Sequence, residues 1–291
     1  MKLSFSTAAF ASAPTWLPAY PIDVVVSRLA AIGYDGLEMV AASPHAYPAY
    51  LDQSKRRDLR SLLEAHNLAV SAMLPVPGGG PGNNVASPLP EERRSTIQHA
   101  RDVLELCHDL GGLTLVFVAG WRVYGVDQEQ AWSWTREGLI EIAKTASDLG
   151  ITIVIEPTPA DSNIVETGGD ALRLMREVSL TNVKVMFDTF HVLYRNEVLS
   201  DYVGELGEHL GYVHLAERGR LAPGDGDADF VSMITALRDV EYSGFLTVEA
   251  GFNRRDVDPT ALARRAHDYL RGVLDSLDRT LGAIPHLPSA G

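Results

Sequence analysis

The sequence predicts a single α/β domain, a (β/α)8 TIM barrel over residues 1–282, followed by a C-terminal tail at 283–291. Short apolar, β-branched runs alternate with longer segments in which apolar residues recur at helical spacing, and this pattern repeats eight times. No linker or change of composition divides the repeats. Strict alternation of strand and helix predicts a parallel sheet. Eight units in 291 residues favour a closed barrel over the alternative, an open doubly wound sheet.

Each predicted element follows from its local pattern. The strands are expected at residues 3–7, 36–40, 68–74, 113–118, 151–155, 183–187, 211–215 and 245–248. The helices are expected at residues 22–32, 55–66, 91–110, 127–149, 169–178, 201–210, 229–240 and 259–281. Gly33 marks the end of the first helix, as glycine commonly does. The Pro/Gly-rich stretch 75–90 is long enough to be a functional loop over a site.

The charge balance excludes some classes of partner. The chain carries 25 Lys and Arg against 38 Asp and Glu, a net charge of −13, whereas a nucleic-acid partner requires a basic surface. We see no signal peptide and no membrane span, and the single Cys107 suits a reducing cytoplasm. We therefore expect a cytoplasmic protein with a small-molecule partner. A homodimer or a homotetramer is compatible with the sequence, which does not decide between them.

Four successive predicted strands each end in a carboxylate or an imidazole. These residues are Glu156, Asp188, His214 and Glu249. In a barrel the C-terminal strand ends form one rim, so the four side chains are expected to face a common cavity. A carboxylate at the end of an apolar strand is costly to bury without a positive partner, and a metal ion is one candidate for that charge. For Asp188 the sequence leaves two alternatives, a cap on the following helix or an ion pair with a distant arginine.

Three carboxylates and one imidazole suit a single divalent metal ion. Hard oxygen ligands favour Mn²⁺, with Co²⁺, Mg²⁺ and Zn²⁺ as alternatives. Such an ion can bind two adjacent oxygens of a sugar and stabilise an enediolate. A glutamate that binds the ion through one oxygen keeps the other free to move protons. The sequence therefore predicts a divalent-metal site whose glutamates can also move protons.

Several motifs carry a resemblance that spans nearly the whole chain. They are Glu156-Pro157, the run Lys-Val-Met-Phe-Asp-Thr-Phe-His at 184–191, His-Leu-Ala-Glu at 214–217, Arg220, Pro-Gly-Asp-Gly at 223–226 and Val248-Glu249. With these motifs the chain resembles the xylose-isomerase-like TIM-barrel superfamily. Within it the chain is most similar to ketose 3-epimerases of the D-tagatose/D-psicose (allulose) type. The motifs are fairly specific for the superfamily and less specific for the substrate.

The resemblance implies roles for these residues. Glu156, Asp188, His214 and Glu249 would hold the metal. Glu156 and Glu249 would also be the catalytic acid/base pair, on opposite faces of the substrate C3. His191 and Arg220 would bind the oxygens around C1–C3 and stabilise the enediolate. The implied activity is epimerisation of a free ketose at C3.

Three further residues are candidates for the substrate pocket. Glu38, on the second strand, either touches the substrate or forms a hydrogen bond inside the barrel. Trp16 and Trp121 follow the first and fourth strands and could wall the pocket. One position departs from the epimerase pattern. These enzymes usually carry a second glutamate six residues after the first, where this chain has Ser162, and we expect the adjacent Asp161 to point elsewhere.

The departure at Ser162 keeps other members of the superfamily open. A hydroxypyruvate- or inosose-type isomerase or dehydratase would use the same metal-binding group. An abasic-site endonuclease is a distant alternative, because it needs extra histidine ligands where strands three and four end in Leu74-Pro75 and Val118-Ala119. A barrel that only binds ligands is a third class, and the intact constellation argues against it.

Overall fold

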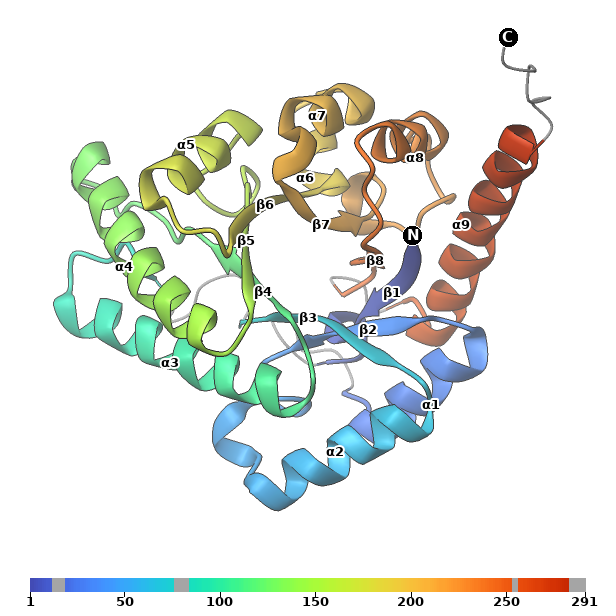
Figure 1. The fold of residues 1–291 in the computed structure, drawn as a ribbon, viewed down its shortest axis with the longest axis horizontal. Helices are drawn as coiled ribbons and strands as arrows, with labels where there is room; N and C mark the ends of the chain where they lie inside the picture. Colours follow the sequence, from blue (N-terminus) through green and yellow to red (C-terminus); the bar gives the residue numbers. More distant parts are fainter. Residues whose placement is uncertain (12–18, 76–83, 253–255, 283–291) are drawn as a thin grey trace, which may run out of the picture.

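The computed structural model describes residues 1–11, 19–75, 84–252 and 256–282. Its eight strands are parallel neighbours in chain order and close into a barrel, with β8 paired to β1 (Figure 1). The strands are β1 (Lys2–Ser6), β2 (Gly36–Val40), β3 (Ala69–Leu74), β4 (Thr114–Val118), β5 (Thr152–Glu156), β6 (Val183–Asp188), β7 (Leu210–Leu215) and β8 (Phe245–Val248). The TIM-barrel prediction is confirmed. The predicted tail at 283–291 lies outside the described residues.

The helices form a ring outside the strands (Figure 1). They are α1 (Ile22–Ile32), α2 (Gln53–Ala65), α3 (Pro90–Asp109), α4 (Gln128–Asp148), α5 (Gly168–Val178), α6 (Thr189–Tyr194), α7 (Leu199–Leu206), α8 (Phe230–Asp239) and α9 (Pro259–Gly282). Within the described ranges, none is long and apolar enough to cross a membrane. The prediction of a helix at 201–210 is wrong in its bounds. Gly207, at φ 50°, ends α7 and starts a 3₁₀ turn, Gly207–His209.

Helix α6 is absent from the prediction, which places no helix between 183–187 and 201–210. It has six residues, too few for a helical period to show in the sequence. Its N-terminus is capped by Asp188, whose carboxylate accepts a hydrogen bond from the Phe190 N–H at 2.8 Å. The strand therefore turns directly into a helix at this carboxylate, and His191 lies on the first turn of that helix.

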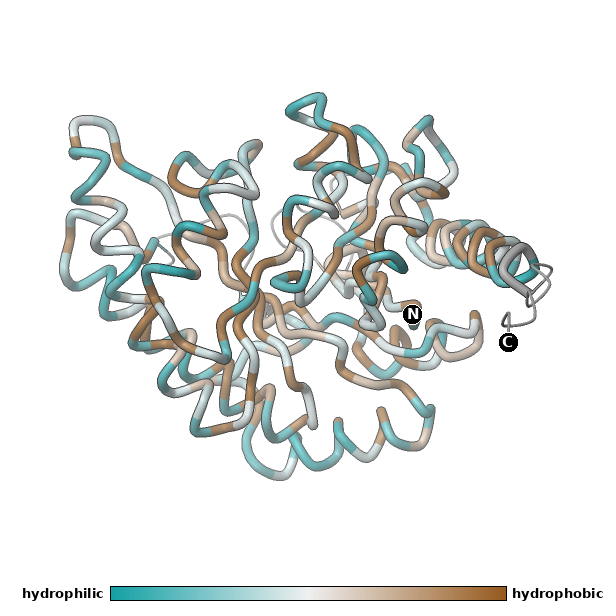
Figure 2. The backbone as a smooth tube through the Cα atoms, turned by 45° about the horizontal axis from the view of Figure 1, so that its top comes forward, coloured by the Kyte–Doolittle hydropathy of each residue, from teal (hydrophilic) through white to brown (hydrophobic). Residues whose placement is uncertain are grey.

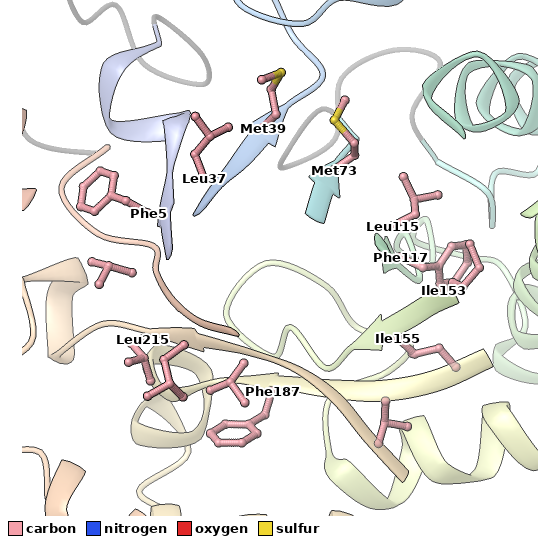
Figure 3. Packing of buried hydrophobic residues seen from close by; sticks show 14 of the residues in the cluster. Phe5, Leu37, Met39, Met73, Leu115, Phe117, Ile153, Ile155, Phe187 and Leu215 are labelled. Carbon is pink, nitrogen blue, oxygen red and sulfur yellow. The ribbon is translucent and has the colours of Figure 1, made fainter. Parts of the chain in front are cut away.

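Strand side chains alternate between two environments. The outward-facing ones, such as Leu37, Met39, Phe187 and Leu215, pack against the surrounding helices in one large apolar cluster (Figure 3). Figure 2 shows the same arrangement along the backbone, with hydrophobic strands at the centre and helices of mixed character around them. Burial on both faces explains why the strands are nearly continuous apolar runs in the sequence.

The inward-facing side chains fill the barrel. Val116, Val154, Met186 and Tyr212 belong to the apolar part of this interior. Beside them runs a chain of hydroxyl groups, in which Ser71 contacts Ser4 at 2.6 Å and Tyr212 at 2.8 Å, and Thr247 donates to Tyr212 at 2.7 Å. These hydroxyl groups satisfy one another's hydrogen bonds in the barrel interior. The inward-facing residues that come later in each strand lie at the C-terminal rim.

Candidate active site

Four side chains converge at the C-terminal rim. Glu156 and Asp188 are the last residues of β5 and β6, His214 lies near the end of β7, and Glu249 directly follows β8. Each falls on the inward side of its strand's alternation, because it lies two residues after an inward-facing neighbour. All four are buried, and they offer ligand atoms that lie within 4.8 Å of one another. The structure thus brings together all four residues that the sequence assigns to the metal.

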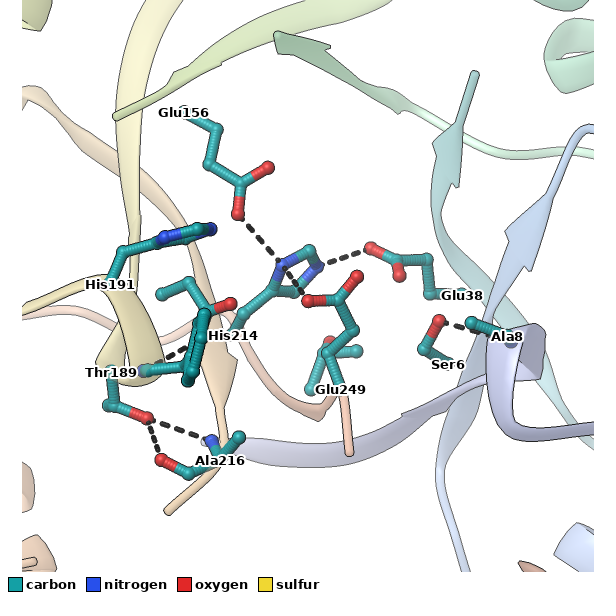
Figure 4. Close-up of polar contacts among 12 residues, drawn as sticks. Ser6, Ala8, Glu38, Glu156, Thr189, His191, His214, Ala216 and Glu249 are labelled. Atoms are coloured by element: carbon teal, nitrogen blue, oxygen red, sulfur yellow. Dashed lines mark hydrogen bonds and ion pairs between the residues drawn. The ribbon is translucent and has the colours of Figure 1, made fainter. Parts of the chain in front are cut away.

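His214 has carboxylates on both sides of its ring, Glu156 and Glu249 on one side and Glu38 on the other (Figure 4). Its Nδ1 is 3.4 Å from Glu156 Oε1 and 3.5 Å from Glu249 Oε2. On the other side of the ring, Nε2 is 2.6 Å from Glu38 Oε2. Glu38 is fully buried behind the imidazole and does not line the pocket, so its position matches the second sequence alternative, a hydrogen bond inside the barrel. A proton on Nε2 that is donated to Glu38 leaves the Nδ1 lone pair directed at the cluster.

Arg220 is the positive group of the site. It lies in a 3₁₀ turn after β7, and its Nη1 contacts Asp188 Oδ2 and, at 2.6 Å, Glu249 Oε2. Its guanidinium carbon is 4.2 Å from the centre of the Phe190 ring and 5.1 Å from that of Phe252. Asp188 therefore satisfies both alternatives left by the sequence, since it caps α6 and pairs with an arginine distant in the chain.

The neighbouring Arg218 points away from this group. Its Nη1 donates to the Leu193 carbonyl, outside the pocket. The two arginines are only two residues apart, but Gly219 between them has φ 71°, a left-handed conformation that turns the chain. This turn decides which guanidinium enters the site.

The electrostatics of the cluster favour a bound cation. Four buried carboxylates, Glu38, Glu156, Asp188 and Glu249, surround one guanidinium and one imidazole, so ionising all four would leave an excess of negative charge. Burial raises the pKa of Glu249 to about 8 and also raises the pKa of Glu156. Both shifts have the same main cause, because burial disfavours the ionised form of each carboxyl group. A divalent ion suits both this charge and the donor set of three carboxylates and an imidazole.

His191, on α6, completes the polar wall. Its Nε2 is 3.4 Å from Arg220 Nη2 and 3.5 Å from Asp161 Oδ2. Burial lowers the pKa of His191 to about 3, so the imidazole is neutral at physiological pH. In the part of the chain that the structure describes, its Nδ1 has no hydrogen-bond partner. A neutral imidazole can donate from one nitrogen and accept at the other, which suits contact with sugar hydroxyl groups.

A cavity of about 100 Å³ opens beside these side chains. Its lining includes Leu74, Val118, Trp121, Glu156, Thr158, Asp161, His191, Arg220, Glu249 and Phe252. The polar groups gather on one side of this lining, while Leu74, Val118 and the two aromatic rings supply apolar surface. Trp121 thus lies where the sequence predicts it. Trp16 lies outside the described residues.

The expectation for Asp161 is wrong. We expected its side chain to point elsewhere, yet it lines the cavity, while Ser162 is buried and donates to the Gly120 carbonyl. The reason is a tight turn, in which the N–H groups of Asp161 and Ser162 both donate to the Thr158 carbonyl, at 2.9 and 2.7 Å. This turn directs the Asp161 side chain to the cavity and the Ser162 side chain into the protein. Counting residues after a strand cannot reveal such a turn. Asp161 is therefore a pocket residue that the sequence analysis placed outside the site, and Thr158 is one that it did not name.

Glu217 organises the loop that follows β7. It is buried, and its carboxylate accepts hydrogen bonds from the Gly224 N–H at 3.2 Å and the Ala228 N–H at 3.0 Å. A Cβ atom at Gly226 would come within 2.5 Å of Glu217 Oε2, so a larger residue there would have to displace this buried carboxylate. The sequence contains this signal, since Glu217 and Gly226 both belong to the motifs quoted above. These bonds tie together the loop that carries Arg220.

Volume alone does not distinguish this site. A larger hollow of about 430 Å³ lies at the opposite end of the barrel, where Thr114, Thr152 and Leu210 begin their strands. Its described lining contains no member of the metal-binding cluster. The chemistry of the side chains, together with the catalytic end of this fold, favours the smaller cavity as the active site.

A family model described as a xylose isomerase-like TIM barrel matches residues 26–273. The chain belongs to this family. Among curated members it is 27% identical over 236 residues to a D-psicose 3-epimerase of Ruminiclostridium cellulolyticum, covering 77% of this chain and 76% of that protein. It is 28% identical over 238 residues to an L-ribulose 3-epimerase of Methylomonas, covering 80% and 79%. It is 24% identical over 268 residues to a fructoselysine 3-epimerase of Shigella flexneri, covering 89% and 95%.

Solved structures of sugar epimerases have the same fold. A D-psicose 3-epimerase from Clostridium cellulolyticum, crystallised with D-tagatose, superposes with a TM-score of 0.82 at 22% identity, covering 95% of this chain and 99% of that one. A 3-keto-D-glucoside 4-epimerase from E. coli superposes with a TM-score of 0.77 at 21% identity, covering 94% and 99%. At these identities the likeness establishes the fold of this family member, and the chemistry has to be argued from its own site.

Proposed function

We propose that this family member is an isomerase, a metal-dependent sugar epimerase that inverts a free ketose at C3. One observation carries the proposal. Glu156 and Glu249 are two buried glutamates from strands on different sides of one metal-compatible cluster, and both line the same cavity. The curated relatives bear the names of sugar epimerases, which supports the reaction class.

Inversion at C3 requires two proton-transfer groups. The C3 proton of a ketose is acidified by the neighbouring C2 carbonyl, so a base can remove it and leave an enediolate. An acid on the other face then returns a proton to C3 with inverted configuration. Glu156 and Glu249 approach the Nδ1 of His214 from β5 and from the end of β8, at 3.4 and 3.5 Å, so both carboxyl groups lie at the same cluster. We propose that the substrate binds with C3 between them.

The enediolate carries negative charge that the site must stabilise. Arg220 is buried and is a donor at the cavity wall. Its Nη2 lies 3.4 Å from Nε2 of the neutral His191, which can accept this hydrogen bond and donate from its other nitrogen. When a divalent ion is bound by Glu156, Asp188, His214 and Glu249, it supplies Lewis-acid stabilisation of the same charge. Mn²⁺ is the ion we propose, with Co²⁺, Mg²⁺ and Zn²⁺ as alternatives.

The cavity favours an uncharged sugar over a sugar phosphate. A phosphate group is bound by several basic side chains or by a nest of backbone N–H groups. Among the described lining residues, Arg220 is the one cation, and it already contacts Asp188 and Glu249. The rings of Trp121 and Phe252 line the same cavity and suit the C–H face of a sugar. A homodimer or homotetramer and a cytoplasmic location remain predictions.

The test is a screen of free ketoses and inososes in D₂O with Mn²⁺ or Co²⁺. Epimerisation at C3 should place deuterium at C3 of a recovered ketose. Isomerisation between aldose and ketose would place it at C1 or C2, and dehydration would remove a hydroxyl group. Deuterium at C3 supports the proposal. Deuterium confined to C1 or C2, or loss of water from an inosose, would replace it with one of the related reactions.

A further inference from the structure

The turn after β5 presents a carboxylate to the cavity that neither the metal cluster nor the proposed proton transfer uses. Thr158, Asp161 and Ser162 form this turn through hydrogen bonds to the Thr158 carbonyl, and the Thr158 N–H donates to the Val165 carbonyl at 3.1 Å. Ser162 is held inside the protein by its bond to Gly120, so it cannot reach a ligand. The turn therefore presents Asp161 to the cavity in a defined direction.

Asp161 has room for a ligand. Its side chain is 56% exposed although it lines the cavity, and its Oδ2 lies 3.5 Å from His191 Nε2. Burial raises the pKa of Asp161, and the nearby Arg220 opposes that shift, so the carboxylate interacts electrostatically with the interior of the site. Asp161 is thus near enough to the reacting region to touch a substrate and open enough to admit one.

Thr158 supplies a second, independent observation. It is buried and lines the same cavity, yet its Oγ1 has no hydrogen-bond partner within the described ranges of the chain. A buried hydroxyl without a partner is costly, and a ligand hydroxyl would satisfy it. The wall formed by Thr158, Asp161 and His191 therefore combines an acceptor carboxylate with groups that can donate, as a sugar hydroxyl group requires.

We propose that Asp161, together with Thr158 and His191, forms a subsite that binds one hydroxyl group of the sugar and so sets substrate specificity. The hydroxyl donates to the Asp161 carboxylate and accepts from a neighbouring donor. The proposal rests on the proposed function, because it places a ketose in this cavity. It predicts that the enzyme prefers a ketose with this hydroxyl over an analogue that lacks it. It also predicts that an anionic substituent at this position is repelled.

The experiment combines variants of Asp161 with analogues of the substrate. The kcat and KM of the wild type, Asp161→Ala and Asp161→Asn are measured on the best ketose from the screen and on analogues that each lack one hydroxyl away from C2 and C3. All measurements use saturating metal. Asp148→Ala is the matched control, because Asp148 is an exposed aspartate at the end of α4. Thermal unfolding of each variant checks that it is folded.

We expect Asp161→Ala to lower kcat/KM on the complete ketose by about 10- to 100-fold, mainly through KM, as for a hydrogen bond to a charged group. One deoxy analogue should already lose a similar factor with the wild type and lose little more with Asp161→Ala. Asp161→Asn, which keeps an acceptor oxygen, should retain more activity than Asp161→Ala. The control should match the wild type.

Two results would overturn the inference while leaving the proposed function intact. The first is an unchanged kcat/KM for Asp161→Ala on the complete ketose. The second is an equal loss on every analogue, which would mean that Asp161 only shapes the loop. Failure of the wild type to turn over any ketose would overturn the proposed function, and this subsite with it. The outcomes of the two proposals are therefore distinguishable.

Discussion

Glu38 Oε2 lies 2.6 Å from Nε2 of His214, and both side chains are fully buried. Beside Glu38 the pairing of β2 with β3 shifts register, so that Leu37 pairs with Val70 but Glu38 pairs with Ala72. Such an irregularity re-aims side chains within a sheet. The carboxylate holds the imidazole in one orientation. An Nε2–H that donates to Glu38 would leave Nδ1 to face the cluster, the arrangement in which a histidine commonly binds a metal ion.

The first prediction concerns metal affinity. Replacing Glu38 by Ala should weaken Mn²⁺ binding by about 10- to 100-fold, because His214 loses the partner that orients it. Titration calorimetry on the substrate-free protein measures this affinity. Glu38→Gln should lose less, since its amide oxygen can still accept from Nε2. The control is Ser71→Ala, which alters the hydroxyl chain below the site without touching His214. Equal affinities for Glu38→Ala and the control would show that Glu38 does not position the ligand.

The second prediction concerns proton transfer. Replacing Glu249 by Gln should lower kcat by about 10²- to 10⁴-fold, because an amide cannot take up or return the C3 proton. Weaker metal binding would add to this loss, so the assay is run at saturating metal, with folding checked by circular dichroism. Exchange of deuterium at C3 should fall in parallel with turnover. A variant that kept more than about a tenth of the wild-type activity with metal bound would remove Glu249 from the acid/base pair.

The third prediction is a pH dependence of the metal-free protein. Burial raises the pKa of Glu249 from its ordinary value of 4.5 to about 8. Between these values the folded protein holds a proton that the unfolded chain has lost. The stability from this group is therefore complete below pH 4.5 and is lost as pH rises through 8. The free energy of unfolding should fall with pH in this window, by at most about 1.4 kcal/mol per pH unit from Glu249.

This dependence is measured by urea unfolding in the presence of a chelator, from pH 5.5 to 8.5. Glu249→Gln should show a shallower slope, because it lacks the titrating group. Saturating Mn²⁺ should flatten the wild-type slope, since a metal ligand must be deprotonated to bind and binding stabilises the folded state. A chelated wild type whose stability rises over this range, with the same slope as Glu249→Gln, would contradict the charge excess inferred for the cluster.

The fourth prediction separates two arginines. Arg220→Lys should lower kcat/KM by about tenfold or more. A lysine ammonium cannot contact Asp188 and Glu249 while stacking between Phe190 and Phe252 as the planar guanidinium does. Arg218→Lys is the control, because Arg218 donates to the Leu193 carbonyl away from the cavity. Steady-state kinetics on one ketose suffices. An unchanged kcat/KM for Arg220→Lys would exclude its role in charge stabilisation.

The fifth prediction concerns the charge of the substrate. Free ketoses should be preferred over the same ketoses phosphorylated at C5 or C6, because the described cavity lining offers a single cation and includes the carboxylate of Asp161. The comparison is kcat/KM for matched pairs at constant metal and ionic strength. A preference of about 100-fold for the phosphorylated form corresponds to roughly 2.7 kcal/mol of transition-state binding and would overturn this assignment.

The barrel and the residues at its rim can be predicted from the sequence alone. Strand and helix periods, and the apolar runs ending in Glu156, Asp188, His214 and Glu249, predict the barrel and the group of residues at its rim. The reason is geometric. A parallel barrel places all C-terminal strand ends on one rim, and the two-residue period of a strand decides which side faces inward. Once the strand ends are located, the convergence of the four ligand candidates follows.

Other features depend on contacts between segments that are far apart in sequence. The pairing of Glu38 with His214 depends on strand register across the barrel, and Arg220 enters the site in place of Arg218 because of the turn at Gly219. Helix α6 is too short for its period to be recognised. Asp161 faces the cavity because hydrogen bonds to the Thr158 carbonyl turn the loop, and no residue pattern encodes that turn. Helices and strands show a residue period that can be recognised in the sequence. The direction of a loop side chain instead depends on single hydrogen bonds, whose partners come together only in the folded molecule.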